Sequence, residues 1–338
     1  MKYKLLGNSG LRVSELCLGT RTFGNRSSLG AEDAESRQIF EAFMEAGGNF
    51  IDTANAYGEG NSEKLVGEFV RAERDRFVIA TKYSFALRQG DPNAGGNHRK
   101  SLRSAVEGSL ERINTDYIDL LWLHAWDSLT PIEEVMRSLD DMVRSGKVLY
   151  LGISDSPAWI AAQANTLARC YGWTPFVALQ GEYSLVERSL ERELLPMARA
   201  FDLAVLTWSP LGSGVLTGKY NSDSPDSGRY SESSEIPPRQ LEIASVVVKI
   251  AEELGKAPSQ VALAWLRAQP GVIIPLIGAR KAYQVQENLG CVDVALSHDH
   301  LQRLEQVSQI ELGFPHDFLA LNGIKKLLTG DTFDNLIV

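Results

Sequence analysis

Eight short apolar segments recur along the chain, and an amphipathic segment follows each of them. Most of the eight do not alternate polar and apolar residues, which is typical of strands covered on both faces, as in a parallel sheet. They are residues 13–18, 50–54, 77–82, 118–124, 150–154, 176–180, 204–209 and 273–278. Eight strand-then-helix units in about 280 residues predict an α/β fold, the (β/α)8 TIM barrel. A doubly wound sheet is the alternative, but it usually has fewer strands.

The segments outside this repeat are expected to decorate one barrel domain that spans residues 1–338. Residues 1–13 turn at Gly7-Asn8-Ser9-Gly10 and predict a hairpin that caps the barrel floor. Residues 299–310 predict an extra C-terminal helix, and residues 311–338 form a tail without a predicted structure. Long loops are expected at residues 84–99 and 211–239, on the face where barrel active sites lie.

Two helix starts are predicted from their capping residues. Thr130 precedes Pro131, with Glu133 three residues on, and Ser156 precedes Pro157 in the same manner. The hydroxyl residue is expected at the N-cap and the proline at the first helical position. Gly172 is expected to end the second of these helices in the left-handed conformation.

Composition excludes several classes of protein. The chain holds 34 Lys and Arg against 43 Asp and Glu, a net charge of -9, which is unsuited to nucleic acid or anionic membranes. Cys17, Cys170 and Cys291 lie far apart, which is typical of reduced thiols in a cytoplasmic protein, and they form no metal-binding pair. No targeting segment is visible, and no apolar run reaches the ~20 residues that span a bilayer.

Polar groups stand where the apolar strands end. In a barrel these strand ends share one mouth, which is where catalytic side chains gather. Each group alone has a structural explanation as a cap, a solvated end or a satisfied core residue, but their convergence favours a functional site. They are Gly19, Thr20, Asp52, Lys82, His124, Ser154, Asp155, Gln180, Trp208, Ser209, Gly278 and Arg280.

Sequence motifs at these ends resemble those of the aldo-keto reductases, in the expected order over about residues 1–310. They are LGT (18–20) with FG (23–24), DTANAYGEGNSE (52–63), ATK (80–82), TDYIDL (115–120) with LH (123–124), GK (146–147) with GIS (152–154), SPLG (209–212), LTGKY (216–220) and IGAR (277–280). The likeness is greatest to members related to potassium-channel beta subunits and to bacterial general aldo-keto reductases.

The resemblance implies NADP-dependent reduction of an aldehyde or ketone, or the reverse oxidation of an alcohol or sugar. It assigns Asp52, Tyr57, Lys82 and His124 to catalysis. Tyr57 would give a proton to the carbonyl oxygen, although free tyrosine, with a pKa near 10, is a poor acid. A Lys82 ammonium would lower that pKa, Asp52 would orient Lys82, and His124 would position the substrate oxygen. No metal is implied.

The resemblance also assigns a cofactor groove for NADPH. Ser154, Asp155 and Gln180 would meet the carboxamide, and Trp208 would stack on the nicotinamide ring where many members have Tyr. The remaining groove residues comprise small strand-end residues, a pyrophosphate segment and an adenosine end; they are Gly19, Thr20, Asp52, Ser209, Pro210, Leu211, Gly212, Gly214, Lys219, Gly278, Arg280, Gln284, Glu287 and Asn288.

Three departures from the family pattern concern the pocket. Asp155 stands where Asn is usual, and a carboxylate accepts hydrogen bonds without donating. Arg21 stands where Trp is frequent, and Trp126 lies in a segment that is commonly Arg-Pro. With Tyr57 and His124, Arg21 and Trp126 are expected to line the substrate pocket and to suit a polar, anionic or sugar-like molecule.

Two other functions stay open at this point. Relatives of this fold act as cofactor-sensing regulatory subunits, and they can retain the same four residues. A barrel lyase or aldolase could use Lys82 as a Schiff base, although the motif around Arg280 disfavours it. The physiological substrate, the direction of the reaction and the oligomeric state are not predicted, and a homo-oligomer is possible.

Overall fold

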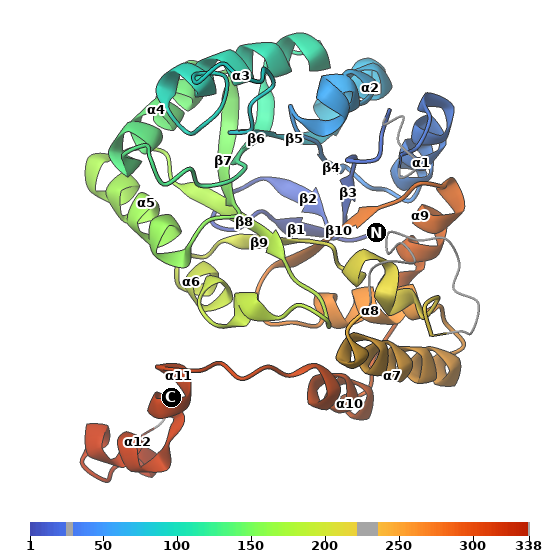
Figure 1. The fold of residues 1–338 in the computed structure, drawn as a ribbon, viewed down its shortest axis with the longest axis vertical. Coiled ribbons are helices and arrows are strands. Elements are labelled where there is room, and N and C mark those ends of the chain that lie inside the picture. Colours follow the sequence, from blue (N-terminus) through green and yellow to red (C-terminus); the bar gives the residue numbers. More distant parts are fainter. Residues whose placement is uncertain (25–29, 222–235, 337–338) are drawn as a thin grey trace.

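Eight parallel strands close into a barrel in the order β10-β3-β4-β5-β6-β7-β8-β9 (Figure 1). The computed structural model describes residues 1–24, 30–221 and 236–336. Closure follows because β10 pairs with β3 on one side and with β9 on the other. The predicted TIM barrel is therefore confirmed. Its strands are β3 (Cys17–Gly19), β4 (Phe50–Asp52), β5 (Val78–Tyr83), β6 (Ile118–Leu123), β7 (Val148–Ser154), β8 (Phe176–Glu182), β9 (Ala204–Trp208) and β10 (Ile273–Gly278).

Helices surround the barrel, and their apolar sides pack on the outward-facing strand residues (Figure 1). The inward-facing residues form a separate core, in which the ring of Trp122 is fully buried. Gly152, its partner across β6 and β7, has no side chain because a Cβ there would lie 2.3 Å from that ring. The helices are α1 (Asp33–Glu45), α2 (Asn61–Val70), α3 (Arg99–Ile113), α4 (Ile132–Arg144), α5 (Ala158–Tyr171), α6 (Leu194–Ala200), α7 (Pro238–Leu254), α8 (Pro258–Arg267) and α9 (Ala282–Leu289).

The predicted hairpin consists of β1 (Tyr3–Leu5) and β2 (Arg12–Ser14), and it covers the N-terminal end of the barrel. Its Leu6 and Val13 are fully buried in the inner core. The turn is held by a hydrogen bond of 2.8 Å from the Asn8 N–H to the Asp202 carbonyl. Gly7, at a φ of +54°, approaches backbone atoms so closely that a Cβ would lie 2.2 Å from the Val177 oxygen.

Three local predictions are corrected. Residues 13–18 are not one strand: β2 ends at Ser14 and β3 begins at Cys17, with Glu15 between them bound to Arg267. Thr130 and Ser156 are not N-caps, because Pro131 and Pro157 take that place with extended ψ angles of 135° and 145°. Gly172 does end α5 in the left-handed conformation, as predicted.

The predicted hydroxyl caps bind elsewhere. The Thr130 hydroxyl donates to Asp127 at 2.8 Å, and the Ser156 hydroxyl donates to the Ser154 carbonyl at 2.6 Å. Since each proline itself lacks an N–H and fixes φ near −65°, it forms the junction between loop and helix without a side-chain cap.

The extra C-terminal helix is α10 (His298–Ser308), close to its predicted bounds. Beyond it the tail holds two short helices, α11 (His316–Ala320) and α12 (Asn322–Thr329), and leads away from the barrel (Figure 1). The predicted loop 211–239 holds a 3-10 turn at Gly212–Thr217, and α7 begins inside its end at Pro238. Residues 222–235 of that loop lie outside the described residues. None of the described helices is long and apolar enough to cross a membrane.

Candidate active site

The polar residues of the barrel mouth continue the inward-facing rows of the core. Side chains alternate along a strand, so the residue two positions after a buried inward one faces inward as well. Phe50, Ala80 and Trp122 belong to the inner core. The next inward positions are Asp52, Lys82 and His124, which the sequence places at the mouth. Ala178 and Leu206 lead in the same manner to Gln180 and Trp208.

Lys82 and Asp52 form a buried ion pair at the centre of this layer. The Lys82 ammonium donates to Asp52 Oδ1 and, at 2.8 Å, to the Thr53 carbonyl. The second carboxylate oxygen of Asp52 accepts a hydrogen bond of 3.0 Å from Gln180 Nε2. Both charged side chains are at most 1% exposed. The carboxylate is therefore held in one orientation by groups from two other strands, β5 and β8.

The pKa of Lys82 is raised above its usual value. Burial, the largest influence, lowers the pKa of the amine, but Asp52 and then Tyr57 raise it by more in sum. Lys82 thus remains an ammonium at neutral pH. A fixed positive charge at this point stabilises negative charge that develops beside it.

Tyr57 returns to the mouth from the turn after β4. The turn, Tyr57–Gly60, contains left-handed backbone at Gly58, Glu59 and Gly60. The centroid of the Tyr57 ring lies 4.8 Å from Lys82 Nζ. It lies 6.1 Å from the centroid of the His124 ring, at an interplanar angle of 81°. The helix that follows this turn, α2, is anchored by its fully buried Glu63.

The anchor at Glu63 joins three elements. Its carboxylate accepts from the Thr81 hydroxyl at 2.5 Å and from the Arg112 guanidinium at 2.6 Å. Arg112 also lies against Gly60, where a Cβ would be 2.6 Å from the Arg112 Cδ. The turn that carries Tyr57 is therefore attached to β5 and α3.

His124 is neutral. Burial, then the charges of Lys82 and Arg21, lower the pKa of its imidazole to about 2. The side chain forms no hydrogen bond to any described residue, and its Nδ1 is buried without a partner. A neutral imidazole can donate a hydrogen bond without placing a second positive charge beside Lys82.

Phe85 is a site residue that the sequence did not reveal. Its ring covers His124 with centroids 4.1 Å apart and an interplanar angle of 36°, and the residue is 44% exposed. The backbone reaches this position through Ser84, whose φ is +113°. The loop is held by Asn97, which donates to the Ser84 hydroxyl and to the Ala125 carbonyl at 2.9 Å each. An aromatic residue shortly after Lys82 was the one available signal.

Asp155 and Trp208 pair across the ends of β7 and β9. The Trp208 indole N–H donates to Asp155 Oδ1 at 3.2 Å. Beside them the Ser154 hydroxyl is buried without a hydrogen-bond partner in the described chain. A cavity of about 280 Å³ adjoins this pair and is lined also by Gln180, Glu182 and Glu187. An unpaired hydroxyl and a carboxylate acceptor match the acceptor and donor of a carboxamide, so these residues fit a nicotinamide.

The segment after β9 is shaped for close approach to its backbone. Ser209, Gly212, Ser213 and Gly214 all have positive φ, between 49° and 94°. A Cβ on Gly214 would lie 3.3 Å from Lys219 Nζ, so this amine lies next to the turn. A cation beside a turn that lets a ligand approach the backbone closely suits a phosphate. Pro210 and Leu211 belong to the same turn. Leu211 packs against both of the hydrophobic clusters that lie between the barrel and its helices.

The Arg280 guanidinium has no hydrogen bond or ion pair to any described residue. Its backbone N–H donates to Gln284 Oε1 at 2.9 Å, which places Gln284 beside it on α9. The neighbouring Lys281 is bound to Glu35 at 3.1 Å. Asn288 is buried one helical turn further on, whereas the Glu287 carboxylate accepts from Ser259 at 2.8 Å.

The remaining predicted residues frame the opening. Gly19 and Gly278 pair across β3 and β10, and the Thr20 hydroxyl donates to the Asp52 carbonyl at 2.9 Å. Arg21 is exposed, yet its charge lowers the pKa of His124, so it lies on the same side of the mouth. Trp126 is partly buried, and its backbone N–H donates to the Asp155 carbonyl at 3.4 Å. No cluster of metal ligands occurs among the described residues.

A family comparison identifies the fold and chemistry together. The model of the "Aldo/keto reductase family" matches residues 15–309. The chain belongs to the aldo/keto reductase family. This aldo/keto reductase is an oxidoreductase of small carbonyl compounds, of a family that typically uses nicotinamide cofactors. The likeness to potassium-channel subunits stays a prediction.

Curated relatives of this aldo/keto reductase match it over nearly its full length. A norsolorinic acid reductase of Emericella nidulans is 40% identical over 92% of this chain and 82% of its own. A norsolorinic acid reductase of Aspergillus flavus is 38% identical over 93% of this chain and 83% of its own. A putative aryl-alcohol dehydrogenase of Saccharomyces cerevisiae is 37% identical over 92% and 88%, respectively.

Proposed function

We propose that this enzyme reduces an aromatic aldehyde or ketone with NADPH, or oxidises the corresponding alcohol, with Tyr57 as the acid. The observation that carries the proposal is the buried Asp52–Lys82 pair with Tyr57 above the ammonium and His124 beside the phenol ring. When bound, the nicotinamide supplies the hydride that reaches the carbonyl carbon.

The chain supplies the proton and the field. As the carbonyl carbon gains the hydride, its oxygen gains negative charge and takes the proton of the Tyr57 hydroxyl. Lys82, kept cationic by Asp52, stabilises the tyrosinate that remains, until solvent returns a proton. His124, neutral and packed under Phe85, donates a hydrogen bond that directs the substrate oxygen toward Tyr57.

The residues proposed to bind the cofactor are those of the predicted groove, taken from its nicotinamide end to its adenosine end. Ser154, Asp155 and Gln180 would hold the carboxamide, and Trp208 would lie against the ring. The turn at Gly212 and Gly214 with Lys219 would hold the pyrophosphate. Arg280 has no acidic partner among the described residues, so it would hold the 2′-phosphate that distinguishes NADPH from NADH.

Two features support an aromatic substrate. Phe85 lies on His124 with part of its surface exposed, so an aryl group beside the reacting carbonyl can pack on a ring. Trp126 lies on the loop that begins after His124. The yeast relative is also named as a putative aryl-alcohol dehydrogenase.

The alternatives are less well supported. A Schiff base requires a neutral amine, and the pKa of Lys82 is raised, which disfavours a lyase. A purely regulatory role has no specific observation in its favour. The test is a panel of matched aromatic and aliphatic aldehydes with NADPH and with NADH. We expect the highest kcat/KM for aromatic aldehydes with NADPH; no turnover with either cofactor would refute the proposal.

A further inference from the structure

The tail after α10 is an arm that the barrel does not cover. Phe314, Leu327 and Leu328 are 86%, 80% and 72% exposed. Other large apolar side chains of the arm are also exposed; they are Phe318, Leu319, Leu321, Phe333 and Leu336. Among the described residues, no hydrogen bond or ion pair joins residues 317–336 to the barrel, and none of them belongs to its cores.

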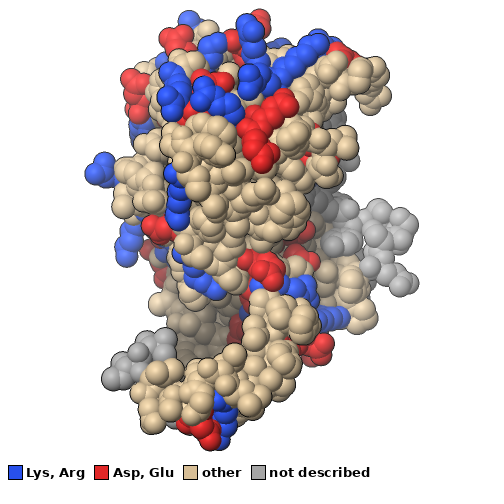
Figure 2. Space-filling model, turned by 90° about the vertical axis from the view of Figure 1, so that its left-hand side faces the viewer, with Lys and Arg blue, Asp and Glu red and all other residues tan. Residues whose placement is uncertain are grey.

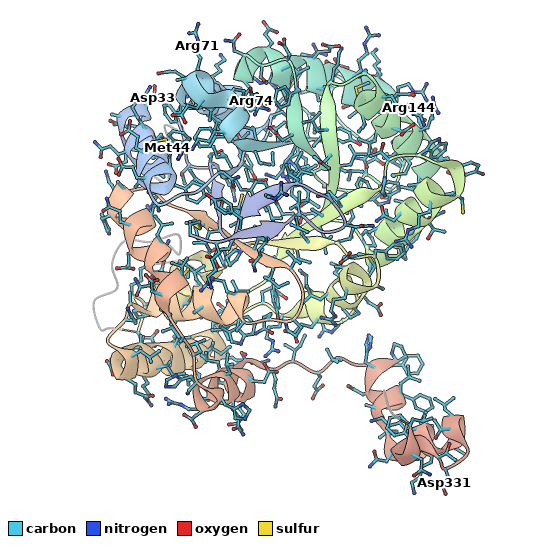
Figure 3. All side chains as sticks on the ribbon, turned by 180° about the vertical axis from the view of Figure 1, so that it is seen from behind. Asp33, Met44, Arg71, Arg74, Arg144 and Asp331 are labelled. Carbon is cyan, nitrogen blue, oxygen red and sulfur yellow. The ribbon has the colours of Figure 1, made fainter. Side chains whose placement is uncertain are left out.

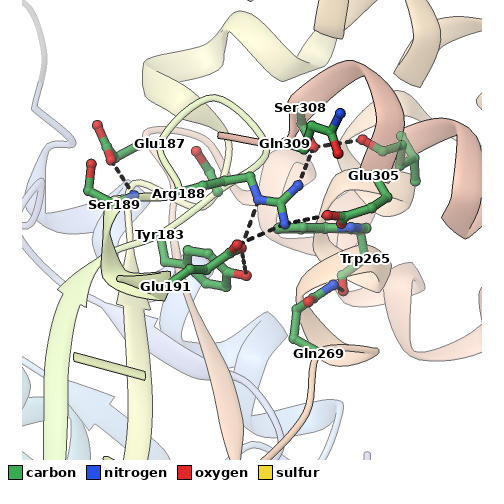
Figure 4. Close-up of polar contacts among 12 residues, drawn as sticks. Tyr183, Glu187, Arg188, Ser189, Glu191, Trp265, Gln269, Glu305, Ser308 and Gln309 are labelled. Atoms are coloured by element: carbon green, nitrogen blue, oxygen red, sulfur yellow. Dashed lines mark hydrogen bonds and ion pairs between the residues drawn. The ribbon is translucent and has the colours of Figure 1, made fainter. Parts of the chain in front are cut away.

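The base of the arm is fixed, so its direction is set by the fold. Arg188, 4% exposed, donates to Glu191, to Glu305 at 2.9 Å and to Ser308 at 2.9 Å, and lies over the Trp265 ring (Figure 4). This network attaches the end of α10 to the barrel. Arg192 then binds the Glu311 carbonyl at 3.0 Å, and His316 contacts the Glu193 carboxylate at 3.2 Å. Beyond His316 the chain leads outward, with Asp331 at its far part (Figure 3).

The arm has the pattern of a helix that binds in a groove. Leu321, Ile324 and Leu328 recur at helical spacing along one side of α12, and Lys325 and Lys326 lie between them in sequence. Apolar residues at i, i+3 and i+7 are the anchors by which an amphipathic helix binds a partner. Isolated helices this short are marginal in water, because their stability comes from packing. The arm therefore requires a cover.

The outer face of α5 is the matching surface on the same chain. Residues 156–181 contain one charged residue, Arg169, although 23% of the chain is charged. The exposed stripe of α5 runs through Trp159, Gln163, Thr166 and Cys170 at helical spacing, with Tyr171 beside it. Aromatic residues without charges are the composition of an interface centre rather than of an ordinary solvated helix.

Both surfaces lie on one side of the molecule. Figure 2 looks onto this side, with the arm at its lower end and a largely uncharged surface above it. Figure 1 shows α5 and the arm at the same edge. On its own chain the arm ends below α5, and among the described residues no hydrogen bond or ion pair joins residues 317–336 to that helix, so a second copy is the cover that we consider.

We propose that two copies of this chain form a dimer in which the arm of each covers the α5 face of the other. One chain carries both complementary surfaces, which is what a two-fold contact requires. Eight exposed arm side chains with roughly 100 Å² each offer about 800 Å² per copy, the size of a standard interface side. A lipid surface suits the arm less well, since acidic residues Asp317 and Asp331 accompany its two lysines.

The test measures the mass of the full-length chain in solution by sedimentation and light scattering. We expect the wild type to have the mass of two chains and Leu327→Glu/Leu328→Glu to have the mass of one chain. The circular dichroism spectrum of the variant should be unchanged. Leu5→Glu is the matched control, since this exposed leucine lies on the hairpin. Gln163→Glu in α5 should raise the dimer dissociation constant by roughly tenfold or more, because it buries an unpaired charge. Gln38→Glu, on the outer side of α1, should not.

Cys170 provides a second readout. It is the exposed cysteine of the three, and it lies in the α5 stripe. Its reaction with a thiol reagent should be slow in the dimer and fast in Leu327→Glu/Leu328→Glu. A monomeric wild type at tens of micromolar would overturn the proposal, and so would a dimer that both variants leave intact. A monomer that binds phosphatidylcholine–phosphatidylserine vesicles through the arm would also overturn it.

Discussion

The ring of Phe85 covers the ring of His124, with 4.1 Å between their centroids. This contact sets both the environment of the imidazole and the nature of the surface that a substrate meets. Because His124 positions the substrate oxygen in the proposed mechanism, Phe85 links substrate shape to the geometry of the reaction.

Phe85→Ala should raise KM for aromatic aldehydes and leave KM for a small aliphatic aldehyde nearly unchanged. Loss of one aromatic contact removes about 0.5–1.5 kcal/mol, which corresponds to roughly a two- to tenfold change in kcat/KM. Phe85→Tyr, which keeps the ring, is the control. Steady-state kinetics on the two aldehydes would decide, and an equal loss for both would contradict a role in specificity.

Tyr57→Phe should reduce kcat by about 10²–10⁴-fold, the usual cost of losing a positioned acid. NADPH binding should persist, because the hydroxyl contacts the substrate oxygen and not the cofactor in the proposed site. Single-turnover kinetics would measure the first quantity, and titration of tryptophan fluorescence the second. Turnover near the wild-type value would rule out Tyr57 as the acid.

Lys82→Met should be inactive and also unstable, since it leaves the Asp52 carboxylate buried without its cation. Breaking such a pair costs about 3–5 kcal/mol. The double variant Asp52→Asn/Lys82→Met should recover much of the free energy of unfolding and none of the activity. Denaturant unfolding and kinetics on the wild type and both variants separate the two effects. Activity in the double variant would show that the pair serves stability alone.

Arg280→Ala should weaken NADPH binding by roughly ten- to a hundredfold and leave NADH binding unchanged, because charge-assisted bonds contribute ~1.5–3 kcal/mol each. Lys281→Ala is the matched control, since Lys281 is already paired with Glu35. Fluorescence titration of both cofactors measures the effect. If Lys281→Ala had the larger effect on NADPH, the 2′-phosphate site would have to be moved by one residue.

His124 predicts an acid-sensitive fold. Its folded pKa of about 2 lies below its unfolded value, so the unfolded chain binds more protons below pH 6.5 and stability falls as pH falls. At pH 5 this one group removes about 2 kcal/mol of unfolding free energy. His124→Gln should lose less stability between pH 7 and pH 5 than the wild type. Denaturant unfolding at both pH values tests this, and identical losses would count against the lowered pKa.

The strand ends were predictable because two simple rules apply to them. Unbroken apolar segments give buried parallel strands, and a period of two then carries the inward rows to Asp52, Lys82 and Gln180. The barrel therefore followed from the sequence with small errors at its edges. Thr130 shows the limit of the capping rule, because its hydroxyl had two competing local partners, and the Asp127 carboxylate three residues earlier prevailed over the helix N-terminus.

What the sequence could not predict depends on single backbone angles and long-range charges. The positive φ of Ser84 places Phe85 on His124, and no residue pattern foretells a serine in that conformation. Arg188 meets Glu305 across more than a hundred residues of sequence, so the fixed base of the arm was equally hidden. The low number of charged residues along α5 is evident in the sequence, but its proposed role depends on the position of the arm, which the sequence does not predict.

The hairpin under the barrel has a kinetic consequence. Leu6 and Val13 close the lower end, and Trp122 fills the centre, so within the part of the chain that the structure describes the active site opens at the loops of the opposite end. Reactant and product must pass through the same opening, and each obstructs the other while it is there. Release of a bulky product will then compete directly with entry of the next substrate molecule. The rate at which product leaves this opening therefore sets an upper limit on turnover.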